Sequence, residues 1–207
     1  MSHIDRLTAL FKEFPGIGSR QAKRFVYFLL TSKPFFVREL IDSIESLRGN
    51  FKQCALCSIF FDARGQETVI SCTLCSDNER DKKTLIIVEK DVDVENIEAS
   101  ERYKGRYFVL GGLLPLFGAK NSALPRLVEC LNTVRTYKQD GSLQEIIIAL
   151  SVHPEGENTT MHLQKLFEPI IARSTIKVTC LGRGLSTGTE LEYSDSQTIK
   201  NALEGRR

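Results

Sequence analysis

The sequence has almost no excess of charge of either sign. Its 28 Lys and Arg residues and 26 Asp and Glu residues leave a formal net charge of +2 over 207 residues. No global basic field therefore marks the chain as a nucleic-acid-binding protein, and any such interaction has to rest on a local patch. With 42% hydrophobic and 26% charged residues, the composition is that of an ordinary globular protein of one or two domains.

Long apolar segments are missing as well. No run approaches the roughly 18 consecutive apolar residues of a membrane-spanning helix. The first residues, MSHIDRLTALFKEF, carry acids and an amphipathic rhythm and lack the three-part build of a secretory signal peptide. We also find no internal repeat, low-complexity tract or long flexible linker. These absences lead us to expect a cytosolic protein.

Four of the six cysteines form two Cys-x-x-Cys pairs, with fourteen residues between the pairs: Cys54, Cys57, Cys72 and Cys75. Four thiolates can surround one Zn²⁺ tetrahedrally at about 2.3 Å per bond, which leaves no open position for water. The pattern therefore predicts a structural zinc site that stabilises a segment with little core of its own. Disulfides or a redox pair are alternatives, but a redox Cys-x-x-Cys needs no second copy. The other two cysteines, Cys130 and Cys180, have apolar neighbours and are predicted to be buried.

The first fifty residues show the spacing of amphipathic helices in three stretches. The first two are separated by FPGIGSRQAKRF at 14–25, where Gly16 and Gly18 form a corner. Glycine permits a turn with positive φ and has no side chain to keep a phosphate away from the backbone. Free N–H groups at the start of the next helix, together with the helix dipole, then favour an anion.

Three basic residues, Arg20, Lys23 and Arg24, follow this corner, and no acid occurs between Pro15 and Leu30. The three residues lie off the apolar stripe of the predicted helix, so they can reach neighbouring phosphates. Because amides and basic side chains contact phosphates and not base edges, we predict DNA binding without sequence preference. The alternative is a plain tight turn with a solvated basic face. A dinucleotide site is disfavoured because a helix, and not a strand, precedes the glycines.

From residue 84 onward, short β-branched runs alternate with helical patterns. The runs TLIIVE, RYFVL, EIIIAL and IKVTCL are typical of buried strands. Helical spacing appears between them, over Leu124–Val134 and Thr159–Ala172. This alternation predicts an α/β layer with a largely parallel sheet.

Three carboxylates follow predicted strands. Glu89 comes after the first run, and Glu155 and Glu157 come after the third, just before the helix predicted at 159–172. Because parallel strands end at one edge of a sheet, these acids can converge there. Such a cluster could hold Mg²⁺. The alternatives are a solvent-facing acidic rim or a surface that pairs with basic residues of a partner.

The order of these parts resembles the RecR family of bacterial recombination mediators, nearly from end to end. The segments that carry the resemblance are FPGIGSRQAKR, CALC, CTLC, CSDNERD, IEASERYKGRYFVLGGLLPL, PEGENTT and GLSTGTELEYSD. The α/β part is similar to the Toprim domain of topoisomerases and primases. The resemblance implies an α+β chain of several parts: a helix-hairpin-helix DNA-binding region at 1–50, a four-cysteine zinc finger at 51–82, a Toprim domain with a mostly parallel sheet at 83–178, and a C-terminal strand and helix segment for oligomerisation at 179–207.

The resemblance also implies a function. Members of this family are non-enzymatic mediators of DNA repair that bind DNA, work with RecO and RecF, and help to load RecA onto gapped or single-stranded DNA. Some form a ring of four subunits that could encircle duplex DNA as a clamp, and such enclosure would reduce the number of phosphate contacts needed.

By motif match, Arg20 and Arg24 stand where the family has DNA-binding basic residues, and Lys23 is basic where a polar residue is more usual. The two Cys-x-x-Cys pairs match the zinc ligands. Glu89, Glu155 and Glu157 match the Toprim acids, which the family uses in partner contacts. The departures are Ser19 for a frequent proline, Ser151 for asparagine, and Phe117-Gly118 for Asp-Gly.

Two other functions compete with a mediator. One is an Mg²⁺-dependent Toprim nuclease or nicking enzyme that uses the three carboxylates. The sequence has no matched general base, and Glu155-Gly-Glu157 replaces the familiar Asp-x-Asp pair. The other is a zinc-dependent protein-interaction module that does not touch DNA.

Overall fold

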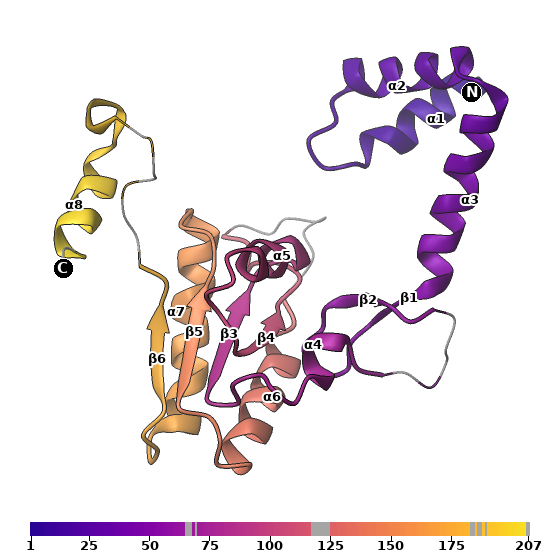
Figure 1. Cartoon of the computed structure of the whole chain (residues 1–207). Helices are drawn as coiled ribbons and strands as arrows, with labels where there is room; N and C mark the ends of the chain where they lie inside the picture. Colours follow the sequence, from indigo (N-terminus) through magenta and orange to yellow (C-terminus); the bar gives the residue numbers. More distant parts are fainter. Residues whose placement is uncertain are drawn as a thin grey trace. The chain divides into compact units, whose positions relative to one another are not determined.

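The computed structural model describes residues 1–64, 68, 70–116, 125–182, 185, 188 and 190–205. Figure 1 shows the order of the helices and strands along the chain. The chain divides into two compact units, Met1–Phe51 with Asp62–Gly65, and Lys52–Phe61 with Gln66–Arg207. None of the helices in the described ranges combines the length and apolar character that crossing a bilayer requires.

The first unit is helical, as the sequence predicts. Its helices are α1 (His3–Lys12), α2 (Ser19–Thr31) and α3 (Pro34–Asn50). A capping box starts α1: the Ser2 hydroxyl accepts a hydrogen bond from the N–H of Asp5, and the Asp5 carboxylate accepts one from the N–H of Ser2, both 3.1 Å long. The rings of Phe11 and Phe25, with centroids 5.6 Å apart, join α1 to α2. Ala22 and Val26 are buried beside them.

The third helix leaves its apolar side chains exposed. Pro34 opens α3 at a position where a missing N–H costs nothing. No residue of α3 is buried. Five large apolar residues along it are exposed: Phe35, Phe36, Ile41, Ile44 and Leu47. So many exposed large apolar side chains on one helix are typical of a protein interface.

The second unit is built on a four-stranded parallel sheet. Its strands are β3 (Thr84–Val88), β4 (Arg106–Val109), β5 (Glu145–Ala149) and β6 (Lys177–Cys180). Their order is β4-β3-β5-β6, and each neighbouring pair is parallel. Val88, at the end of β3, is paired with Val109 on one side and Ala149 on the other. The four predicted strands and their parallel arrangement are therefore confirmed.

Two apolar cores, one on each face of the sheet, hold the layers together. Along β3, Leu85 and Ile87 belong to one core and Ile86 and Val88 to the other, which explains the unbroken apolar run. The first core is closed by α6 (Leu127–Gln139) and α7 (Pro154–Ile171), and the second by α5 (Asp91–Ala99) and the cysteine segment. Figure 1 shows α5 and α7 on opposite sides of the strands. Near the C-terminus lie a short 3-10 helix, η1 (Leu191–Tyr193), and α8 (Ser196–Glu204).

Two expectations from the sequence are wrong in detail. The helix predicted at 159–172 begins five residues earlier, at Pro154, so the PEGENTT segment is helical. Proline suits the first helical turn, which is why the helix can start there. Cys130 is buried as predicted, but Cys180 is exposed, because β6 is the last strand in the sheet order. Phe117 and Gly118 lie outside the described residues.

Candidate functional site

The two Cys-x-x-Cys pairs come together in a small knuckle. The knuckle contains β1 (Phe51–Gln53), β2 (Phe60–Asp62) and the short helix α4 (Thr73–Ser76). The first pair lies in the turn between β1 and β2, and the second lies at the start of α4. The four Sγ atoms lie within 4.8 Å of one another, and those of Cys57 and Cys72 are 3.5 Å apart. Tetrahedral Zn–S bonds of about 2.3 Å place sulfur atoms about 3.8 Å apart, so the cluster fits Zn²⁺.

The close contact of the four thiols shifts their pKa values in opposite directions. The pKa of Cys54 lies far below its ordinary value because its Sγ accepts hydrogen bonds from Cys57 first, and then from Cys72 and Cys75. The N–H of Cys72 also points at this sulfur, at 3.4 Å. Conversely, the pKa of Cys57 is raised, because its proton is held in the bond to Cys54. A metal ion that binds here has to displace the remaining protons, so metal binding depends on pH.

Three long-range hydrogen bonds attach the knuckle to the sheet unit. The N–H of Val109, on the outer strand β4, donates to the carbonyl oxygen of Cys57 at 2.8 Å. The N–H of Phe60 donates to the carboxylate of Asp91, the first residue of α5, at 2.7 Å. The hydroxyl of Thr133 on α6 donates to the carbonyl oxygen of Leu56 at 3.4 Å. No local sequence pattern predicts these contacts, since each joins residues that are far apart in the chain.

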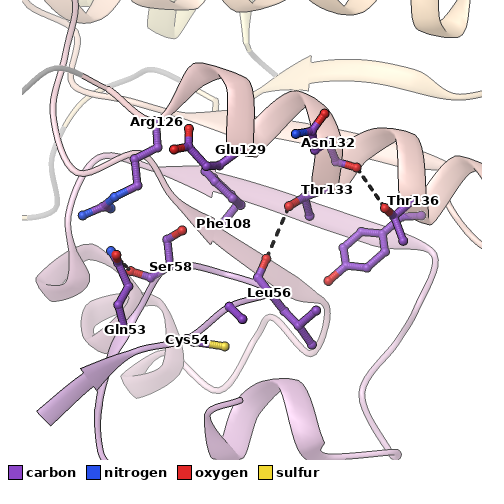
Figure 2. Close-up of a pocket in the computed structure, with 12 residues that line it drawn as sticks. Gln53, Cys54, Leu56, Ser58, Phe108, Arg126, Glu129, Asn132, Thr133 and Thr136 are labelled. Carbon is purple, nitrogen blue, oxygen red and sulfur yellow. Dashed lines mark hydrogen bonds between the residues drawn. The ribbon is translucent and has the colours of Figure 1, made fainter. Parts of the chain in front are cut away.

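A cavity of about 470 Å³ lies between the knuckle and α6. Figure 2 shows the Thr133–Leu56 hydrogen bond crossing it, with Gln53, Cys54 and Ser58 on one side and α6 on the other. The Arg126 guanidinium, which also lines the cavity, is held by a 3.0 Å bond to the carbonyl oxygen of Val109. Residues of the knuckle, of β4 and of α6 therefore line the same cavity.

A half-buried ion pair lies next to this attachment. Arg80, in the CSDNERD segment, forms two hydrogen bonds with the carboxylate of Glu98 on α5, of 3.0 and 2.5 Å. Its Nε donates to the carbonyl oxygen of Gly105 at 2.9 Å. The Tyr107 hydroxyl donates to the same carboxylate at 2.5 Å. The hydrogen bonds from Arg80 are the main reason why the pKa of Glu98 lies below its usual value. A forked guanidinium–carboxylate pair is both strong and directional.

The three acids matched to the Toprim edge do not gather as a metal site. Glu89 follows β3 and is 7% exposed, with its carboxylate held by Ser151 Oγ at 2.9 Å and by Lys90 Nζ at 2.8 Å. Glu155 and Glu157 lie in the first turn of α7 and are exposed. In the described part of the chain, only the four cysteines form a group of three or more metal-ligand side chains within 4.8 Å. The predicted convergence of carboxylates on Mg²⁺ therefore finds no support in this geometry.

The glycine corner turns through a positive φ at Gly16 and opens α2 without a side-chain cap. Gly16 has φ of +77°, a conformation that favours glycine. Gly18 is the N-cap of α2, without a side-chain cap, and no atom lies within 4 Å of the place where a Cβ would stand at either glycine. Arg20, Lys23 and Arg24 are exposed, and the first turn of α2 holds no acid. The backbone N–H groups at the start of α2 and the basic side chains that follow are therefore both accessible to solvent.

Comparison with known proteins decides the family. The chain is 38% identical over 205 residues to the recombination protein RecR of Bifidobacterium animalis subsp. lactis, covering 99% of this chain and 95% of that protein. It is 37% identical to the RecR of Paenarthrobacter aurescens and 33% identical to that of Chloroherpeton thalassium, with similar coverage. This chain belongs to the RecR family.

Two family models locate the parts. Residues 83–182 match the Toprim domain, which covers β3 to β6 and the helices between them. Residues 184–207 match the C-terminal segment of RecR, which contains α8. The fold expected from the resemblance is confirmed: a helical N-terminus, a four-cysteine cluster and an α/β Toprim domain. Membership of the RecR family supports a role in DNA recombination and repair.

Proposed function

We propose that this protein is a non-enzymatic DNA-binding mediator of recombinational repair. In this proposal it acts as a clamp with RecO and RecF and helps to load RecA onto gapped or single-stranded DNA. The observation that carries the DNA-binding part is the corner at Gly16 and Gly18, where an uncapped helix start opens beside exposed basic side chains. Family membership supports the remainder.

In this proposal the phosphate backbone lies against the start of α2. A phosphate accepts hydrogen bonds from the free N–H groups after Gly18, and neighbouring phosphates pair with Arg20, Lys23 and Arg24. The open space at both glycines allows a close backbone approach. None of these groups reads base edges, so affinity should not depend on sequence.

Fluorescence anisotropy with a labelled gapped duplex tests this interface. Replacing Arg20 and Arg24 together by Ala should weaken binding to every DNA sequence alike and flatten the dependence of log K on log salt by about 0.9 for each lost phosphate contact. Arg48→Ala is the matched control, because Arg48 is an exposed basic residue on α3. An unchanged affinity in the double variant would favour a protein-interaction module instead, whereas a changed base preference would refute phosphate contact.

A homo-oligomer, such as a ring of four subunits, fits the exposed apolar side chains. Five apolar residues of α3 are exposed, and Leu191, Tyr193 and Leu203 are exposed in the C-terminal segment that we assign to oligomerisation at 179–207. Enclosure of DNA by a ring would also suit a chain with net charge of only +2. Native mass spectrometry with and without duplex DNA would measure the subunit number. A monomer in both conditions would refute the clamp.

The remaining assignments follow the same division of the chain. Cys54, Cys57, Cys72 and Cys75 hold one structural zinc in the finger at 51–82.

We assign the Toprim acids Glu89, Glu155 and Glu157 to contacts with basic residues of RecO or RecF. Their reversal to Lys should abolish co-purification with those partners while DNA binding persists.

A Toprim nuclease is the competing function, because the domain is present. Against it, Glu89 is engaged by Ser151 and Lys90, while Glu155 and Glu157 stay exposed. Incubation of the zinc-loaded protein with gapped DNA and Mg²⁺ separates the two functions. Cuts that require Mg²⁺ and vanish in Glu89→Gln would establish the nuclease and overturn the mediator.

A further inference from the structure

A small cavity of about 150 Å³ lies against the four-cysteine cluster. Cys57 and Cys75 line it together with Arg106, the first residue of β4, and Tyr137 of α6. Other polar groups of its wall come from Asp77, Asn78, Arg80 and Lys82. The cavity therefore brings cationic side chains to two of the four sulfur ligands.

Arg106 is held in this wall with an unused donor. Its guanidinium stacks on the ring of Tyr137, with 3.9 Å between the Cζ atom and the ring centroid. Its Nη1 atom is buried and has no hydrogen-bond partner among the described residues. A buried charged donor without an acceptor is costly, so such a group needs a compensating negative charge nearby.

The other charged groups of the cavity are already engaged or solvated. Arg80 is paired with the carboxylate of Glu98. Lys82 is exposed. The exposed carboxylate of Asp77 accepts a hydrogen bond from the N–H of Glu79 at 2.9 Å. This leaves the half-buried Arg106, whose Nη1 atom is buried, as the cation of the wall for which the described residues offer no carboxylate.

A metal-loaded cluster would supply the missing charge. Four thiolates around one divalent cation carry a double negative charge. Cys54 and Cys72 are each 2% exposed and Cys57 is 0% exposed, while Cys75 is half-buried, so most of this charge is removed from water. Taking it out of water is unfavourable unless cations or N–H donors face it. The mostly buried thiolate cluster needs a facing cation, and the buried Nη1 of Arg106 lacks an acceptor among the described residues, so the two charges can stabilise each other.

We propose that Arg106 is the charge partner of the four-cysteine metal centre, and that its guanidinium stabilises the buried zinc–thiolate group across the cavity. The role is that of a positioning residue, since Arg106 does not itself bind the ion. The proposal rests on the zinc site proposed above. It also gives Tyr137 a function, because the ring holds the guanidinium against the cavity.

The rate of zinc release from the full-length protein to a chromogenic chelator tests this role. Loss of groups that support a metal site from outside typically weakens metal binding by about 10–100-fold. We expect Arg106→Gln to release zinc faster by a factor in that range. Arg102→Gln is the matched control, because it removes the same charge at an exposed position four residues away and should release zinc at the wild-type rate.

Two further measurements exclude a merely structural role. Arg106→Lys keeps the positive charge and should release zinc at a rate close to wild type. This variant still tests the role of the charge if Arg106→Gln fails to fold. Arg106→Gln should lower the melting temperature of the zinc-loaded protein more than that of the zinc-free protein. Equal release rates in Arg106→Gln and wild type, or release from Arg106→Lys at the glutamine variant's rate, would overturn the proposal. Wild-type protein that contains no zinc would instead refute the metal site on which it rests.

Discussion

The carbonyl oxygen of Cys57 accepts a 2.8 Å hydrogen bond from the N–H of Val109, so the turn that carries the first cysteine pair is bonded directly to the outer strand of the Toprim sheet. Val109 is itself in register with Val88 at the end of β3. Glu89, the acid assigned to partner contacts, directly follows β3. If the knuckle becomes disordered, the end of β4 and the neighbouring end of β3 lose a hydrogen-bonded support. Glu89 lies at this edge of the sheet.

Loss of one metal ligand should disorder this junction. Cys72→Ser leaves three thiols, which cannot close a tetrahedral site, and structural zinc contributes about 10–16 kcal/mol to such segments. We expect zinc to be lost and hydrogen exchange at the Val109 N–H to accelerate. Cys180→Ser is the control, since Cys180 is exposed and distant in sequence from the knuckle. Full zinc content with unchanged exchange in Cys72→Ser would contradict the site.

The sequence predicted the parts of this molecule whose signals are local. Each strand of the sheet contains a short run of β-branched or aromatic residues, and the four cysteines stand at the spacing that a zinc finger requires. The start of α7 was misplaced because Gly156 interrupts its first turn, although Pro154 is a favourable first residue. Helix α5 was not predicted, since Val92, Val94 and Ile97 do not form a clear apolar stripe. The contacts of Val109, Asp91 and Thr133 with the knuckle depend on tertiary packing, which no local pattern encodes.

Gly156 is needed for the close approach of α7 to the end of β5. A Cβ added there would stand 1.9 Å from the backbone carbonyl oxygen of Ser151, which cannot rotate away. Gly156→Ala should therefore lower the free energy of unfolding by about 1–3 kcal/mol in urea titrations. It should also disturb the Ser151–Glu89 hydrogen bond and weaken partner binding.

The matched control for this change is Gly49→Ala on α3. No atom lies within 4 Å of the added Cβ at Gly49, so only helix propensity changes. We expect Gly49→Ala to raise stability by up to about 1 kcal/mol. Equal effects of the two substitutions would show that the crowding at Gly156 is relieved by movement of the helix.

The Arg80–Glu98 pair should make stability depend on pH. The pKa of Glu98 is held below its ordinary value of 4.5, chiefly by the hydrogen bonds from Arg80. A carboxylate with a lowered pKa in the folded state stabilises the fold above its unfolded pKa, and this contribution is lost as the pH falls through the folded pKa. At pH 7, Glu98→Gln should lower the free energy of unfolding by about 1.5–3 kcal/mol.

The difference between wild type and Glu98→Gln should shrink in urea titrations as the pH falls below 4.5 and should vanish once the carboxyl of Glu98 is protonated in the folded state. Glu95→Gln on the same helix is the control, because Glu95 is exposed. A difference that stays constant from pH 7 to acid would mean that packing, and not the charge of Glu98, stabilises the junction.

Gly18→Ser separates the requirements of folding from those of DNA binding. Serine is a good N-cap, and its hydroxyl would accept a hydrogen bond from an N–H in the first turn of α2, so stability should rise by a few tenths of a kcal/mol. The same hydroxyl would occupy a donor that the proposal gives to a phosphate, and the side chain would fill the open space at the corner. Loss of about one charge-assisted hydrogen bond corresponds to roughly tenfold weaker DNA binding. Anisotropy titrations and thermal melts of the same preparation would measure both effects. A variant that is more stable and still binds DNA with wild-type affinity would show that the backbone at Gly18 does not face the phosphate.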